Sequence, residues 1–243
     1  MRKNDIDELL LDVEENLRIL HERQQAAVTD PEIHELFKVK VKECLEHLKS
    51  VLDYAANDIY EIILNSPELG KGVKVYFPYG INTEDINDKI RKVFPRLSQV
   101  NQPVRDLVGS IQTPSQTGWL KIICSIRNTN SHSRLMKQRR EDMAGHSLFN
   151  GGINFIGENF QNIQMINNTY ADGNGLQKYV PHVTVDITDR KINLDENELK
   201  ELDGNRFDLS IFVFDENNLP VVSLIGEAHS KIKEFVSQMY QLI

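Results

Sequence analysis

The feature that most constrains the fold is a segment near the middle of the chain that is apolar on almost every side. In the run WLKIICSI, residues 119–126, few side chains are polar, and the large apolar ones are Trp119, Leu120, Ile122, Ile123 and Ile126. A helix of this composition is stable only when other elements surround it. We therefore expect residues 119–126 to form a helix that is buried in a helical bundle.

The residues before this segment supply the rest of such a bundle. From about Asn4 to Val28, apolar residues recur every three or four positions and form one stripe on a helix. Pro31 fits the first turn of a second helix, with Asp30 as its cap, and this helix is expected to run toward Leu64. The short corner between them predicts an antiparallel hairpin.

Two shorter helices are predicted before the central segment. The first runs from about Thr83, which is expected to cap it, to Phe94, where Pro95 ends it. The second lies around Val104 to Ile111. Up to residue 132 the chain is therefore expected to be almost entirely helical.

The pattern changes after residue 140. Residues 144–178 are rich in Asn and Gly and predict short strands joined by turns, and alternating apolar residues in 183–187 predict a clearer strand. The strongest strand pattern is 207–214, with 219–224 as its hairpin partner, and a helix is expected from about Gly226 to Leu242. The predicted fold is α+β: a mainly helical bundle in residues 1–140, followed in 141–243 by a small antiparallel β region and a terminal helix packed on the bundle.

Charge and cysteine content narrow the function. The formal net charge of -8 argues against a protein that coats nucleic acid through many cationic contacts, so any such contact must be local. Cys44 and Cys124 stand alone and are interpreted as buried free thiols in a reducing compartment. No apolar run approaches the roughly 20 residues of a membrane span, which predicts a cytoplasmic protein without membrane contact.

Polar residues whose side chains could take part in catalysis follow the apolar segment directly. Arg127 is followed by four weak helix formers, Asn128 to Ser131, and then by His132. We expect the helix to end or kink at these residues. A guanidinium that stays charged and an imidazole that titrates near neutral pH would then lie at one helix end, an arrangement suited to anchoring and protonating a phosphate.

These residues carry a resemblance to a known family. Arg127, Asn128 and His132 match the Arg-polar-x-x-x-His signature of the HEPN superfamily, small helical bundles that include many prokaryotic ribonuclease toxins and antiviral effectors. Upstream, LEHLKSVLDYAANDIYE is similar to the long helix of one HEPN-like branch, and VYFP followed by NQP has the same order as in that branch. The resemblance covers roughly Leu36 to Leu135.

The resemblance implies a metal-independent endoribonuclease without a cofactor, acting in phage defence or a toxin-antitoxin system. In such an enzyme Arg127 would hold the scissile phosphate, His132 would act as general acid or base, and Asn128 would orient one of them. The nucleophile would be the neighbouring ribose 2′-hydroxyl. The resemblance also implies a homodimer, with an antitoxin or regulatory protein as a further partner.

Helix geometry limits how the two catalytic candidates can meet. Five residues turn an α-helix by about 500°, which leaves Arg127 and His132 roughly 140° apart. They can converge only if residues 128–131 leave the regular helix or if two copies of the chain combine. The following basic run, which is expected to start an exposed helix or to form a loop, predicts RNA contacts through Arg134, Lys137, Arg139 and Arg140. Its alternative interpretation is a solvated helical face.

A structural interpretation of the motif stays open beside the catalytic one. Arg127 would then pair with a buried carboxylate, Asp53 or Asp58, and His132 would cap the helix. The chain would be a non-catalytic dimerisation or interaction module, or an inactive bundle that restrains a partner enzyme.

Overall fold

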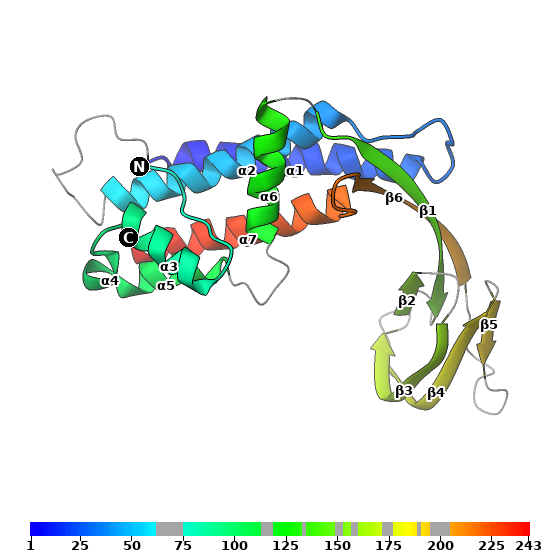
Figure 1. Cartoon of the computed structure of the whole chain (residues 1–243). Helices are drawn as coiled ribbons and strands as arrows, with labels where there is room; N and C mark the ends of the chain where they lie inside the picture. The colour runs from blue at the N-terminus through cyan, green and yellow to red at the C-terminus, as the bar shows by residue number, and fades with distance from the viewer. Residues whose placement is uncertain are drawn as a thin grey trace. The chain divides into compact units, whose positions relative to one another are not determined.

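The computed structural model describes the backbone of residues 1–61, 75–112, 119–132, 135–148, 153–156, 160–171, 177–188, 191–194 and 205–243. It describes side chains in residues 1–61, 75–112, 119–128, 135–142 and 210–243. Within these ranges there are seven helices and six strands (Figure 1). The helices are α1 (Lys3–Ala26), α2 (Lys38–Ile59), α3 (Thr83–Val93), α4 (Leu97–Val100), α5 (Gln102–Ser110), α6 (Trp119–His132) and α7 (Val221–Leu242). The strands are β1 (Gln138–Leu148), β2 (Ile153–Ile156), β3 (Phe160–Ala171), β4 (Gln177–Thr188), β5 (Lys191–Leu194) and β6 (Asn205–Phe214). The fold is therefore α+β and mainly helical, with a closing helix, as predicted.

Contacts group the chain into two compact units. The first contains residues 1–23, 35–139 and 212–243, and the second contains residues 24–34 and 140–211. The sequence interpretation grouped the terminal helix with the strands but predicted that it packs on the bundle; this packing is confirmed, and the contacts group residues 212–243 with the helical unit. The reason is that α7 buries its apolar face against α1 and α2.

Helices α1 and α2 are antiparallel, which confirms the predicted hairpin. The Arg2 side chain, just before α1, donates to Asp58 near the end of α2 at 2.8 Å. At the other end of the pair, the Arg23 Nε donates to the carbonyl oxygen of Glu35, just before α2, at 2.9 Å. Early residues of one helix thus meet late residues of the other.

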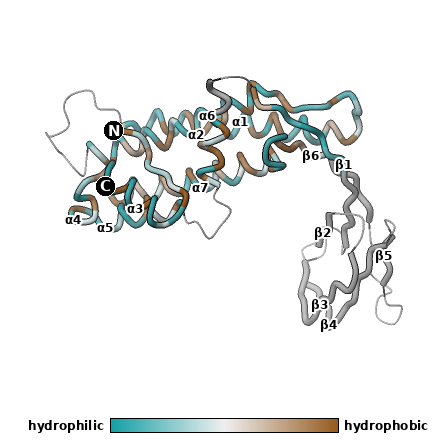
Figure 2. The backbone as a smooth tube through the Cα atoms, viewed as in Figure 1, coloured by the Kyte–Doolittle hydropathy of each residue, from teal (hydrophilic) through white to brown (hydrophobic). Residues whose placement is uncertain are grey.

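Helix α7 packs on both of these helices and completes the core. Its His229 Nε2 lies 3.1 Å from the carbonyl oxygen of Leu10, and its Tyr240 hydroxyl donates to Asp58 at 2.6 Å. Figure 2 shows apolar residues recurring along all three helices. The buried apolar side chains of α7 are Val221, Leu224, Ile225, Ala228, Ile232, Phe235, Val236 and Met239.

The shorter helices lie beside this core. Helix α5 contacts both α3 and α7. The N-cap of α3 is Asn82, whose side chain accepts from the Asp85 backbone N at 2.9 Å, so the cap lies one residue before the predicted Thr83. Asn101 caps α5 in the same way, through the Val104 backbone N.

The strands form two three-stranded sheets, in the orders β2-β1-β6 and β3-β4-β5. Strands β3 and β4 are antiparallel, with Met165 opposite Val183, and β4 pairs with β5 in the same sense, with Ile187 opposite Ile192. The strands predicted at residues 183–187 and 207–214 are confirmed as parts of β4 and β6.

The predicted start of the second helix is wrong. Residues 31–37 are not helical, and α2 begins at Lys38. Contacts from distant residues hold this segment outside the helix: Gln138 Oε1 accepts from the Leu36 backbone N at 3.1 Å. The Arg140 guanidinium donates to the carbonyl oxygens of Asp30 and Ile33 at 2.9 and 3.2 Å. These hydrogen bonds replace those that a helix would make.

Where the structure describes it, the basic run after His132 is a loop, one of the two predicted alternatives, only up to residue 137, and it continues as a strand. Residues 135–137 lack regular structure, and β1 begins at Gln138. Met136 and Gln138 are buried while Lys137 and Arg139 are exposed, so burial alternates with the period of a strand.

The predicted hairpin partner of the last strand is a helix start instead. Residues 214 and 219 close a turn, because the Phe214 backbone N donates to the Leu219 carbonyl oxygen at 3.0 Å, and α7 begins at Val221. The β-branched residues that favoured a strand are the first turn of the apolar stripe of α7. Burial against the bundle outweighs their weak strand propensity.

Candidate functional site

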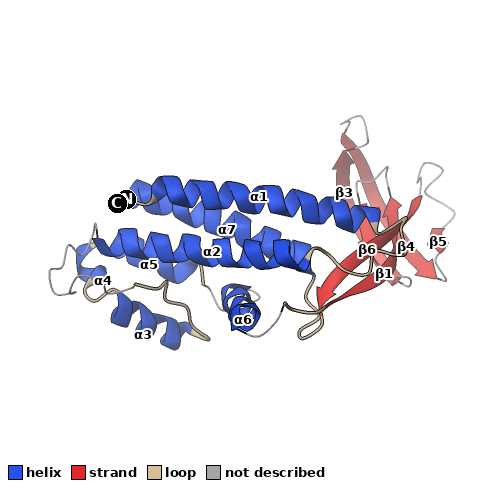
Figure 3. Cartoon of the chain, turned by 90° about the horizontal axis from the view of Figure 1, so that it is seen from above, coloured by secondary structure: helices blue, strands red, loops and turns tan. Residues whose placement is uncertain are grey.

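Helix α6, which carries the predicted motif, crosses α2 and α7 (Figure 1). Figure 3, turned by 90°, views it nearly along its own axis. The apolar residues of its first two turns are buried as predicted, although Ile122 is only half-buried. The fully buried apolar residues are Trp119, Leu120, Ile123, Cys124 and Ile126. This packing fixes the direction in which each later residue of α6 points.

One face of α6 remains exposed. Lys121, Ser125 and Asn128 are exposed and are spaced by four and three residues, so they share one side of the helix. The helix continues without a break through residues 128–131 and ends at His132, so the predicted end is confirmed and the alternative, a kink, does not occur. The weak helix formers each cost only about 0.7 kcal/mol or less, and the well-packed first turns tolerate that loss. Position 132 comes four residues after Asn128 and falls on the same face.

Arg127 begins on the opposite, packed side and its guanidinium reaches toward this face. The residue is half-buried, and its Nη1 lies 3.4 Å from Asn128 Oδ1. Its Nε is buried and has no hydrogen-bond partner in the described part of the chain. The Arg127 guanidinium thus retains hydrogen-bonding capacity for an acceptor.

The carboxylates expected to pair with Arg127 in the structural interpretation are bound elsewhere. Asp53 accepts from the Phe77 backbone N at 2.8 Å and forms an ion pair with Lys49. Asp58 is occupied by Arg2 and Tyr240. Among the residues that the structure describes, Arg127 has no carboxylate partner, so that part of the structural interpretation is wrong.

The residues predicted to bind RNA fall into three groups. Lys137 and Arg139 are exposed at the start of β1. Arg140, in the second unit, donates to Asp30 and Ile33 and to Asp142 Oδ1 at 2.6 Å, so its guanidinium has a structural role. Arg134 lies outside the described residues, as does the His132 side chain.

Arg140, Asp142 and Ser210 form a hydrogen-bonded cluster. The Asp142 Oδ1 accepts from the Ser210 hydroxyl as well as from Arg140, each at 2.6 Å. The hydrogen bond from Ser210, and then that from Arg140, hold the pKa of Asp142 below its usual range. The cluster joins β1, β6 and the segment around Asp30 within the second unit.

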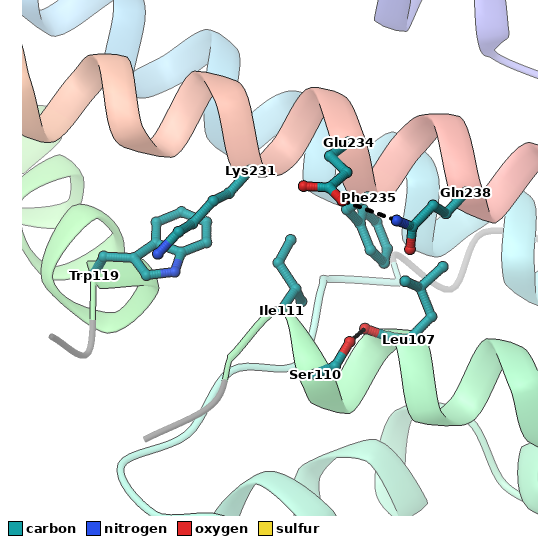
Figure 4. A pocket seen from close by; sticks show the side chains of 8 residues that line it. All are labelled: Leu107, Ser110, Ile111, Trp119, Lys231, Glu234, Phe235 and Gln238. Carbon is teal, nitrogen blue, oxygen red and sulfur yellow. Dashed lines mark hydrogen bonds between the residues drawn. The ribbon is translucent and has the colours of Figure 1, made fainter. Parts of the chain in front are cut away.

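The structure also contains a pocket that sequence reasoning missed. It has a volume of about 190 Å³ and lies between the end of α5, the start of α6 and the middle of α7 (Figure 4). Apolar walls come from Leu107, Ile111, Trp119 and Phe235, and Lys231, Glu234 and Gln238 stand at its polar side. No local pattern signals such a pocket, because its residues are spread over more than a hundred positions of the sequence.

The two cysteines are buried. Both cysteines are free, and burial raises the pKa of each thiol to about 12. No group of three or more His, Cys, Asp or Glu residues suited to a metal ion occurs within the described ranges. No described helix is long and apolar enough to cross a membrane.

Fold and site together define a mainly helical α+β protein with a polar motif on an exposed helix face. Comparisons with family models, curated proteins and solved structures found no match.

Proposed function

We propose that this chain is a HEPN-like, metal-independent endoribonuclease that acts as a homodimer. The observation that supports it most is the Arg127 guanidinium, which has no carboxylate partner in the described residues and lies beside Asn128 on the exposed face of α6. An arginine without a neutralising partner offers a fixed positive charge and a planar set of donors to a phosphate. Position 132 lies on the same face as Asn128, about 140° around the helix from position 127.

The proposed chemistry needs only groups of the chain and of RNA. The ribose 2′-oxygen attacks the adjacent phosphorus, and the bond from phosphorus to the 5′-oxygen breaks. One residue takes the proton of the 2′-hydroxyl, the leaving 5′-oxygen receives a proton, and His132 serves as general acid or base. Arg127 stabilises the charge that develops on the phosphate oxygens, and Asn128 orients the guanidinium. The products carry 2′,3′-cyclic phosphate and 5′-hydroxyl ends.

Because α6 is unbroken, the proposed active site requires two copies of the chain. Because Arg127 and His132 leave a regular helix about 140° apart, one chain presents them in different directions. In a twofold dimer, Arg127 of one copy meets His132 of the other, and two equal sites form. Lys137, Arg139 and Arg134 then extend the contact along RNA, while an antitoxin or regulatory protein controls the activity in phage defence or a toxin-antitoxin system.

A non-catalytic interaction module is the second candidate. Two observations favour it: the continuous helix leaves the backbone positions 127 and 132 about 140° apart within one copy, and the Arg127 Nε is buried. In that case the exposed face of α6 binds a protein partner, and no RNA is cleaved.

Cleavage of tRNA and ribosomal RNA in EDTA, with analysis of fragment ends, tests the proposal. Wild-type protein is expected to give 2′,3′-cyclic phosphates. Arg127→Ala and His132→Ala should each lose at least about a hundredfold in rate. Lys121→Ala is the matched control, because it removes a positive charge from the same helix without touching the motif.

Mixing the two inactive variants tests the shared site. If each site combines Arg127 of one copy with His132 of the other, a mixed dimer has one intact site, and an equal mixture recovers about a quarter of wild-type activity. No recovery from exchanging dimers would contradict the shared site. If neither the wild-type protein nor any folded variant cleaves any RNA, the result would instead support the interaction module.

A further inference from the structure

We infer that the pocket between α5, α6 and α7 binds a guanine base. The inference rests on the proposed function only in taking RNA as the source of that base. A free guanine nucleotide offers the same ring and is the other source.

The walls of the pocket suit a flat ring. Trp119 and Phe235 are both buried, with 3% and 2% of their surfaces exposed, so packing fixes them as walls. Phe235 is held edge-on against Phe77, with ring centroids 5.4 Å apart and an interplanar angle of 85°. Because these two rings are almost fully covered, the accessible apolar surface of the pocket comes mainly from the half-buried Leu107 and Ile111, which can pack against the flat face of a base.

The size of the pocket selects a single base. Its volume is about 190 Å³, below the roughly 300–1,000 Å³ of pockets that enclose a drug-sized ligand. A ribose and phosphate attached to the base would therefore lie outside, where a longer RNA can continue.

The polar side of the pocket selects the kind of base. Glu234 is exposed, its Oε1 accepts from Gln238 Nε2 at 3.0 Å, and it forms no ion pair in the described part of the chain (Figure 4). A carboxylate accepts two parallel N–H groups well. Guanine offers such a pair, N1–H and the 2-amino group, on its Watson–Crick edge.

The neighbouring cation completes the match. The Lys231 ammonium lies 5.4 Å from the centroid of the Trp119 ring and is held by Glu227 Oε1 at 2.6 Å. It provides a donor for the guanine O6, which is next to N1–H on the same edge. Adenine, cytosine and uracil each place a ring or carbonyl acceptor against the Glu234 carboxylate, and that contact is repulsive.

The position of the pocket fits a strand that also reaches Arg127. Trp119 and Arg127 are eight residues apart on α6, about 12 Å along its axis. A strand covers this separation in about four nucleotides or fewer, at a stacked rise of roughly 3.4 Å. A guanine in the pocket would therefore set which phosphate lies at Arg127.

Trp119 makes the binding test direct, because it is the only tryptophan in the chain. Its fluorescence is followed during titration of the full-length protein with guanosine 5′-monophosphate, under red-edge excitation where nucleotides do not absorb. We expect a saturable change, with binding at least tenfold weaker for the monophosphates of adenosine, cytidine and uridine. Equal responses to all four, or no saturable change in folded protein at millimolar nucleotide, would overturn the inference.

Two matched variants locate the binding. Glu234→Gln keeps the shape of the side chain and should weaken guanosine monophosphate binding about tenfold or more. Glu22→Gln makes the same change at an exposed residue of α1 that does not line the pocket, and should leave the affinity within about twofold. An unchanged affinity in Glu234→Gln would refute the assigned contact.

Synthetic RNAs with one guanine or none separate this inference from the proposed function. Cleavage that depends on the guanine, and loses that dependence in Glu234→Gln, supports both. Binding of the monophosphate without cleavage of any RNA supports the pocket with a free nucleotide as ligand and counts against the ribonuclease. Cleavage that ignores guanine, in protein that does not bind the monophosphate, overturns the pocket and leaves the ribonuclease standing.

Discussion

Replacement of Asp58 by asparagine should be among the most destabilising single changes in the helical unit. The Asp58 side chain is fully buried and lies where α1, α2 and α7 meet. Its Oδ2 accepts from the Arg2 backbone N at 2.8 Å and from the Tyr240 hydroxyl at 2.6 Å, and its Oδ1 accepts from Arg2 Nη1 at 2.8 Å. One carboxylate thus joins three helices.

The size of the effect follows from these contacts. Removing one partner of a buried ion pair costs about 3–5 kcal/mol. Arg2 keeps Glu61 as a partner and its side chain is 31% exposed, which places the expected loss near the lower limit, at about 3 kcal/mol. For a chain of this length that loss lowers Tm by about 6–12 °C. Tyr240→Phe, which removes one hydrogen bond to the carboxylate, should cost about 1.5 kcal/mol.

Glu61→Gln is the matched control. Glu61 binds the same arginine, at 2.6 Å, but its side chain is 55% exposed, and water screens the pair. Its replacement should cost less than about 1 kcal/mol. Urea unfolding followed by circular dichroism gives the free energy of unfolding of each variant. Equal losses for Asp58→Asn and Glu61→Gln, or losses that add fully in an Asp58→Asn, Tyr240→Phe double variant, would refute this account of Asp58.

Two further predictions concern buried groups. Cys44 and Cys124 should not react with a thiol reagent at pH 8 in the native protein, because burial raises both pKa values to about 12, and should react once urea unfolds the chain. Rapid labelling of the folded protein would contradict their burial. Burial also lowers the pKa of His229, which faces Glu14 and Lys233, below the ordinary value of about 6.5. The unfolded chain then binds a proton more readily, so stability should fall as the pH drops below about 6.5, and should fall less in His229→Gln, as measured by urea midpoints at pH 7 and pH 5.

Local periodicity predicted most of the helices, because the apolar face of each one follows from the spacing of apolar residues within a short segment. The stripe of α1 and the apolar run at the start of α6 are examples, and both are buried where expected. Prediction failed where distant residues decide the local conformation. The segment before α2 resembles a capped helix start, yet Gln138 and Arg140 satisfy its backbone from more than a hundred residues away.

The candidate site shows the same division. The sequence indicated Arg127, Asn128 and His132, and the helical period alone gives their relative directions. Only the folded chain showed that Asp53 and Asp58 are already paired, so that neither neutralises Arg127. The pairing of a buried carboxylate depends on which helices meet, and spacing along one helix carries no such information.

What the sequence determined by itself is where the chain forms most of its helices and strands and which face of each is apolar, because these properties depend on neighbours within a few residues. The tertiary structure decided that α7 joins the first two helices, that Asp58 lies fully buried among three of them, and that Trp119 becomes the wall of a pocket. Each depends on contacts between residues far apart in the sequence. Such contacts are selected by how much apolar surface the whole chain buries and by which buried polar groups find partners.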